Sequence, residues 1–181
     1  MTHSEEPVKL SMDEIKVLDL FASSEMKCAD LYRQFEVLYA DLPELALLWR
    51  KTAEEEDNHA QQFKLASRLK GRGMEGVKVD GEQCTIILQT IETYTNTMQQ
   101  LHPSPTEALS FAIQLEESLL EYHMSTVVHF IDPELSKLFK AMMGNDRGHV
   151  NMLHNVLDNM IKNNLVLDND NDREAVNLTL G

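Results

Sequence analysis

Two short segments of the chain repeat a pattern in which a carboxylate residue stands three places before a histidine. A lone glutamate precedes each of these pairs at nearly the same distance along the sequence. Carboxylates and imidazoles that project from four helices into the centre of a bundle are the ligands that hold two iron or manganese ions. The pattern therefore predicts a dinuclear metal site. Its six expected ligands are Glu25, Glu56, His59, Glu116, Asp146 and His149.

The spacing within each pair suits a helix that faces a metal ion. Residues three places apart on a helix lie about 60° apart around the axis and about 4.5 Å apart along it, so both can approach one site. Four carboxylates and two imidazoles combine hard oxygen with borderline nitrogen, which suits iron or manganese and leaves open positions for dioxygen or peroxide. Asp146 has about 1.5 Å less reach than a glutamate. We therefore expect it to bind one ion only, to bind through water, or to mark a weakened second position.

The composition fits a single acidic domain. The chain has 181 residues and a formal net charge of -14, which argues against nucleic acid and anionic membranes as partners. Cys28 and Cys84 form neither a short metal-binding spacing nor a disulfide framework, which favours a reducing cytoplasm. No segment approaches the run of about 18 apolar residues that a membrane helix needs. We expect neither a transmembrane helix nor a signal peptide.

The ligands of the first half are expected on two helices. A polar arm covers residues 1–10, and a Ser-x-x-Glu capping box at Ser11 opens the first helix. Apolar residues recur at helical spacing on both sides of its lone glutamate, up to a break at Pro43. The second helix has the same kind of apolar stripe around Glu56 and His59. All three ligands are therefore expected to point inward.

The second half repeats this organisation after a long crossover, residues 71–104. Within the crossover, Cys84 to Leu101 predicts a short helix, although its threonines and isoleucines leave a strand open. A capping box at Ser104 opens the third helix, and Pro133 opens the fourth. The chain is thus expected to be all-α. Its predicted parts are the flexible arm (1–10), a four-helix bundle (11–162) and an acidic C-terminal tail (163–181).

Residues 11–162 resemble the ferritin-like superfamily, and within it the rubrerythrin-type branch. The resemblance rests on Glu25 with Tyr32 seven places later, and on the strings AEEEDNHA, LEESLLEYH and MGNDRGH. It implies an antiparallel four-helix bundle with a long crossover between helices 2 and 3. It also implies a diiron centre that reacts with hydrogen peroxide or dioxygen, in which the lone glutamates and the carboxylate-x-x-His pairs bridge or terminally ligate the metals.

The sequence departs from the rubrerythrin pattern at three places. The family usually has glutamate where this chain has Asp146, which puts equal occupancy of the two metal positions in doubt. Leu119 stands where typical members carry a further glutamate, so their redox-linked ligand switching is not expected. The rubredoxin-like tail with four cysteines does not occur in this sequence. A peroxidase reaction would therefore need an external electron-donor protein.

Two further polar residues lie on the stripes of the lone glutamates. Tyr32 follows Glu25 by seven places, and His123 follows Glu116 by the same number. Each lies on the ligand face about 10 Å further along its helix. Each is expected either to hydrogen-bond a ligand or relay a proton or electron, or to be a buried polar group satisfied by the opposite helix.

The resemblance implies an oxidoreductase that reduces hydrogen peroxide or oxidises ferrous iron at a dinuclear iron site. Dioxygen is a further expected substrate, and manganese or zinc are expected substitutes for iron. Two alternatives stay open at this point. The protein could bind or store iron without turnover, or it could be a structural bundle that metal stabilises. We expect a homodimer, with neither nucleic acid nor membrane as a partner.

Overall fold

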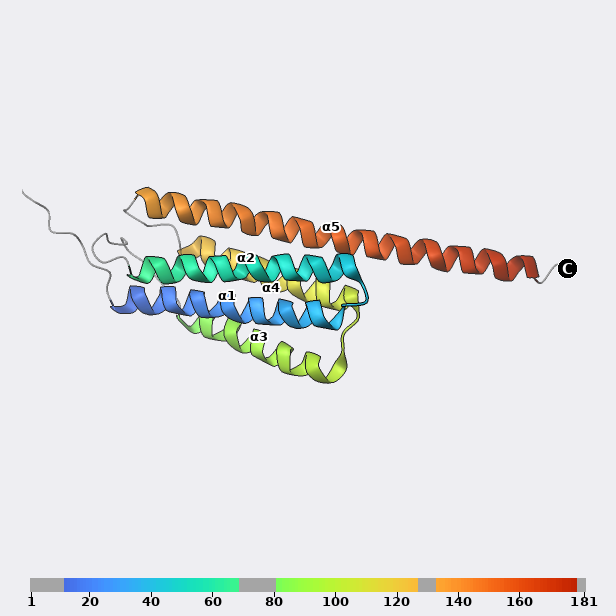
Figure 1. Cartoon of the computed structure of the whole chain (residues 1–181), viewed down its shortest axis with the longest axis horizontal. Helices are drawn as coiled ribbons and strands as arrows, with labels where there is room; N and C mark the ends of the chain where they lie inside the picture. Colours follow the sequence, from blue (N-terminus) through green and yellow to red (C-terminus); the bar gives the residue numbers. More distant parts are fainter. Residues whose placement is uncertain (1–11, 69–80, 127–132, 179–181) are drawn as a thin grey trace, which may run out of the picture.

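The computed structural model describes the backbone of residues 12–68, 81–126 and 133–178, and the helices in these ranges account for nearly all of them. No strand occurs within the described ranges, which confirms the all-α prediction. None of the described helices combines the length and the apolar character that crossing a membrane requires. The five helices are α1 (Met12–Leu38), α2 (Pro43–Arg68), α3 (Gly81–Leu101), α4 (Pro105–Thr126) and α5 (Pro133–Leu178), as shown in Figure 1.

A tight turn joins α1 to α2 where the sequence predicts a break. The backbone N–H of Tyr39 donates to the Phe35 carbonyl over 3.0 Å, and the N–H of Leu42 donates to the Tyr39 carbonyl over 2.9 Å. Pro43 then occupies the first position of α2, where a helix needs no backbone N–H donor. The two helices pack against each other along their lengths (Figure 1).

Successive helices alternate in direction, so α1, α3 and α5 run one way and α2 and α4 run the other (Figure 1). The crossover is itself largely a helix, because α3 runs back along α1 and brings the chain to the end where α4 begins. The sequence of this segment predicts a helix and leaves a strand open, and the structure confirms the helix. The glycines expected to end α2, at residues 71 and 73, lie outside the described residues.

The start of α4 is the capping box that the sequence predicts. The backbone N–H of Ser104 donates to Glu107 Oε2 over 2.8 Å, and the N–H of Glu107 donates to Ser104 Oγ over 3.3 Å. The bond from the Ser104 backbone is the main reason why the pKa of Glu107 lies below its usual value. Just before this box, His102 has a φ of 45°, the left-handed conformation that ends helices such as α3. The capping box expected at Ser11 lies outside the described residues.

The last helix, α5, packs against α4 and α2 and then extends beyond the other helices (Figure 1). The sequence analysis ended the bundle at residue 162 and assigned residues 163–181 to a tail. The helical backbone of α5 continues into this segment, through Leu178. No proline or glycine occurs between His149 and Leu178, so no residue with a strong helix-terminating tendency interrupts it.

Aromatic side chains form the core between α1 and α2. Phe35 and Trp49 lie 4.8 Å apart between ring centroids, and Tyr32 and Trp49 lie 5.6 Å apart. Phe21 and Phe63 stack at 5.0 Å on the other side of the ligand positions. All five side chains are buried. Packing of this kind fixes the rotation of the two helices relative to each other, and with it the direction of every inward side chain.

The core continues from α1 through α3 to α4. Phe35 contacts Tyr94 of α3 with ring centroids 6.4 Å apart, and Tyr94 stacks face to face on Phe111 of α4 at 3.3 Å. Ile87 and Ile91 of α3 are buried at helical spacing. α3 therefore contributes packing to the core, and none of the predicted ligands lies on it.

Candidate metal centre

Five of the six predicted ligands are buried side chains on four different helices. Charged residues are rarely buried to this extent unless they are paired or bound to a metal. The side chain of the sixth residue, Asp146, lies outside the described residues. The exposed fractions are Glu25 1%, Glu56 1%, His59 4%, Glu116 4% and His149 7%.

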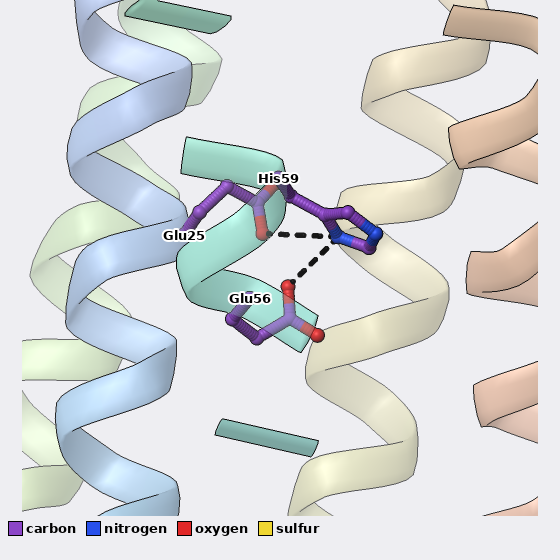
Figure 2. Close-up of side chains that lie close together, drawn as sticks. All are labelled: Glu25, Glu56 and His59. Carbon is purple, nitrogen blue, oxygen red and sulfur yellow. Dashed lines mark hydrogen bonds and ion pairs between the residues drawn. The ribbon is translucent and has the colours of Figure 1, made fainter. Parts of the chain in front are cut away.

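The most compact part of the centre is formed by α1 and α2. His59 Nδ1 lies 3.2 Å from Glu56 Oε2 and 4.0 Å from Glu25 Oε2 (Figure 2). One ligand atom from each of the three residues can be chosen so that all lie within 4.8 Å of one another. The two carboxylates and the imidazole converge on one point between the helices. This buried group could hold a metal ion.

The electrostatics of Glu56 show what a cation would relieve. Burial raises the pKa of Glu56 well above its usual value, and the hydrogen bond and negative charge of Glu25 raise it further. His59 acts in the opposite direction and only partly offsets them. Glu56 Oε1 has no hydrogen-bond partner within the described part of the chain. Without a cation, burial and Glu25 therefore favour the protonated form of the Glu56 side chain, whereas a bound metal ion would supply the missing positive charge.

Glu116 joins the centre from α4 through a tyrosine of α1. The Tyr32 hydroxyl donates a hydrogen bond to Glu116 Oε1, and the Tyr32 side chain is fully buried. Burial and the negative charge of Glu116 raise the pKa of Tyr32 well above its usual range, so the hydroxyl keeps its proton. Tyr32 is thus a buried polar group that is paired across two helices, and it is also a hydrogen-bond donor to a predicted ligand. The sequence allowed for both of these roles. The side chain of His123 lies outside the described residues.

The structure adds Cys28 to this region, which the sequence analysis used only to infer the compartment. Its side chain is fully buried. Burial is the main cause that raises the pKa of the Cys28 thiol, followed by the charges of Glu116, Glu25 and Glu56. All three carboxylates are thus close enough to act on one buried thiol. The sequence signal was available, because Cys28 lies one helical turn after Glu25 on the same stripe.

His149 brings α5 into the centre. Its ring lies beside that of His59, with centroids 6.0 Å apart, and its Nδ1 lies 3.7 Å from Glu56 Oε1. On the other edge of the ring, Nε2 contacts the carboxylate of Glu55 of α2. Glu55 was not among the predicted ligands, because its sequence position is adjacent to Glu56 and on a helix it points about 100° away. The contact of Glu55 with His149 becomes evident only from the position of α5 beside α2.

A pocket of about 640 Å³ opens on the histidine side of the centre. Glu55, His59 and His149 all contribute to its wall, whereas neither Glu25 nor Glu56 does. The remaining wall residues are mainly of polar or charged types. They are Asn58, Gln61, Gln62, Lys64, Leu65, Arg68 and Asn145.

No family model, curated protein or solved structure matches the chain. Carboxylate oxygen and imidazole nitrogen together favour divalent iron, manganese or zinc over calcium and magnesium. The two histidines stand between the pocket and the carboxylates, so a small molecule that enters the pocket meets the nitrogen side of the centre first.

Proposed function

We propose that this protein is a ferritin-like four-helix bundle of the rubrerythrin type, with a dinuclear iron site between α1, α2, α4 and α5. In this proposal Glu25, Glu56 and His59 hold one ion, and Glu116, Asp146 and His149 hold the other. The protein acts as an oxidoreductase that reduces hydrogen peroxide, or that oxidises ferrous iron with dioxygen or peroxide. The helix α3 takes the place of the long crossover.

The observation that carries the proposal is the pair of buried carboxyl groups beside His59. Glu25 and Glu56 come from different helices and are each 1% exposed. Glu56 lies 3.2 Å from His59 Nδ1, and its second oxygen has no hydrogen-bond partner within the described ranges. Two carboxylates in an apolar core are strongly unfavourable when both are ionised, and a divalent cation removes that penalty. The donor set therefore fits iron well.

The surrounding side chains support redox chemistry, because aromatic rings keep water out of one end of the site while the pocket leaves the histidine side open. Two ferrous ions, when bound, supply the two electrons that convert hydrogen peroxide and two protons into two waters, and an external electron-donor protein restores them. Tyr32 holds a proton on its hydroxyl and directs it at Glu116 Oε1. Trp49 and Phe35 pack against Tyr32 and exclude water from that end. The pocket admits a small oxidant on the histidine side.

Metal content and peroxide consumption test the proposal. Elemental analysis of protein purified without added metal should give two irons per chain, and the ferrous protein should consume hydrogen peroxide. Glu56→Gln should abolish consumption, because a neutral amide is a far weaker iron ligand than a carboxylate. Glu54→Gln is the matched control, since Glu54 lies on the exposed face of the same helix.

The same measurements separate the alternatives. Undiminished consumption by Glu56→Gln would exclude this site as the place of reaction. A large shell with hundreds of irons per assembly would indicate storage. If metal removal lowers the melting temperature but the ferrous protein reacts with neither peroxide nor dioxygen, the metal has a structural role.

A further inference from the structure

Glu55 and His149 form a contact between α2 and α5 that the proposed ligand set leaves unexplained. The Glu55 carboxylate pairs with Nε2 of His149, while Nδ1 on the opposite edge of the ring faces Glu56 Oε1 at 3.7 Å. Neighbouring residues on a helix point about 100° apart, so Glu56 enters the core and Glu55 reaches around the edge of α2 toward α5. The imidazole of His149 thus lies between two carboxylates of one helix, one at the pocket and one in the interior.

We propose that Glu55 is a positioning residue for His149. Its carboxylate accepts the Nε2–H of the ring and so selects the tautomer in which Nδ1 carries the lone pair. That lone pair then faces the interior near Glu56 Oε1, where it would be available to the second ion of the proposed site. A neutral imidazole has one N–H and one lone pair, so fixing the N–H on one edge fixes the lone pair on the other. The inference rests on the proposed function, because it assigns the atom through which His149 binds metal.

The surroundings of His149 distinguish this contact from an ordinary surface ion pair. The chain offers a direct comparison in His154 of α5, whose Nε2 lies 3.3 Å from Glu117 Oε1 and whose side chain is half-exposed, like that of its partner. His149 is buried and its ring stacks beside that of His59, with centroids 6.0 Å apart and an interplanar angle of 24°. Rotation of such a ring is restricted, so the partner at Nε2 determines what Nδ1 offers to the interior.

The position of Glu55 at the pocket adds a second consequence. Its side chain is half-exposed and forms part of the pocket wall, together with His59 and His149. Glu55 therefore reaches His149 from the pocket side, at the edge of the ring opposite the one that faces Glu56.

Zinc-loaded protein tests the proposal, because zinc is diamagnetic and allows nitrogen NMR of the histidine rings. In the wild-type protein, His149 should show a metal-bound Nδ1 and a protonated Nε2. Glu55→Ala should weaken zinc binding about 10- to 100-fold and remove the single-tautomer signature of His149. Glu55→Gln keeps an oxygen acceptor at the same place and should restore most of the affinity. Glu117→Ala, which removes the carboxylate beside the surface residue His154, should change neither measurement.

Two results would overturn the assignment while the proposed function stands. One is zinc bound through Nε2 of His149 in the wild-type protein. The other is a Glu55→Ala variant, folded by circular dichroism, that keeps both the wild-type affinity and the wild-type ring signals. Failure of the wild-type protein to bind zinc, manganese or iron would instead refute the proposed function, and the role of Glu55 would fall with it.

Discussion

Replacing Glu56 with glutamine should make the metal-free protein more stable at neutral pH, although the same change removes a metal ligand. Burial and the neighbouring Glu25 raise the pKa of Glu56 in the folded state well above its usual value of 4.5. At a pH between the usual pKa of the unfolded chain and the raised pKa of the folded state, Glu56 is protonated in the folded protein and ionised in the unfolded chain. Unfolding then releases a proton, so rising pH favours the unfolded state. Glutamine is neutral at every pH and lacks this penalty.

The size of the effect follows from proton linkage. Protonated Glu56 gives its full stabilisation to the fold below pH 4.5, which is the usual pKa of the side chain. Above that pH the free energy of unfolding falls by about 1.4 kcal/mol for each pH unit, until the pH passes the folded-state pKa. In a chain of this size, 1 kcal/mol shifts the melting temperature by about 2–4 °C. The melting temperature of Glu56→Gln should therefore rise relative to wild type by about 3–6 °C per pH unit above pH 4.5, up to the folded-state pKa of Glu56.

Thermal unfolding of chelator-treated protein, followed by circular dichroism at several pH values, measures this difference directly. Glu54→Gln, on the exposed face of α2, should follow the wild-type curve within error. A constant difference between Glu56→Gln and wild type across this pH range would refute the reasoning. So would a wild-type protein that gains stability relative to the variant as the pH rises, since that would mean that Glu56 is ionised and stabilised in the metal-free fold.

Three further outcomes are expected. Tyr32→Phe should lower the free energy of unfolding of the metal-free protein by about 1–3 kcal/mol, because the buried Glu116 loses its hydrogen-bond donor, and an unchanged urea midpoint would contradict this. Phe63→Ala should cost about 3–5 kcal/mol in the same assay, because its fully buried ring stacks on Phe21 at 5.0 Å. Zinc at about 100 times its dissociation constant should stabilise the wild-type protein by about 2.7 kcal/mol and leave Glu56→Gln nearly unchanged, as measured by calorimetry.

The inward placement of the first three ligands could be predicted from the sequence, because apolar periodicity alone fixes which face of a helix is buried. Glu25, Glu56 and His59 lie on such stripes, and all three are buried as expected. The capping box at Ser104 was equally predictable, since it depends on residues three places apart. The local sequence pattern was sufficient to predict a feature wherever that feature depends on a single helix.

The features that the sequence did not reveal depend on how two helices meet. The contact of Glu55 with His149 requires α2 and α5 to lie at one particular height and rotation, which no local pattern encodes. The helical state of α3 was left open because threonine and isoleucine also favour strands. Its burial of Ile87 and Ile91 at helical spacing, against neighbouring helices, selects the helix.

The centre has one wet side and one dry end. His59 and His149 stand at the pocket, whereas the rings of Tyr32, Phe35 and Trp49 pack together toward the turn between α1 and α2. The pocket on the histidine side is therefore a route by which small molecules could reach the centre. If the proposed reaction uses this route in both directions, a product leaves along the path by which the next substrate arrives, and the two compete for it. Bulky groups introduced at the pocket wall should slow arrival and departure together, while substitutions among the rings should affect neither.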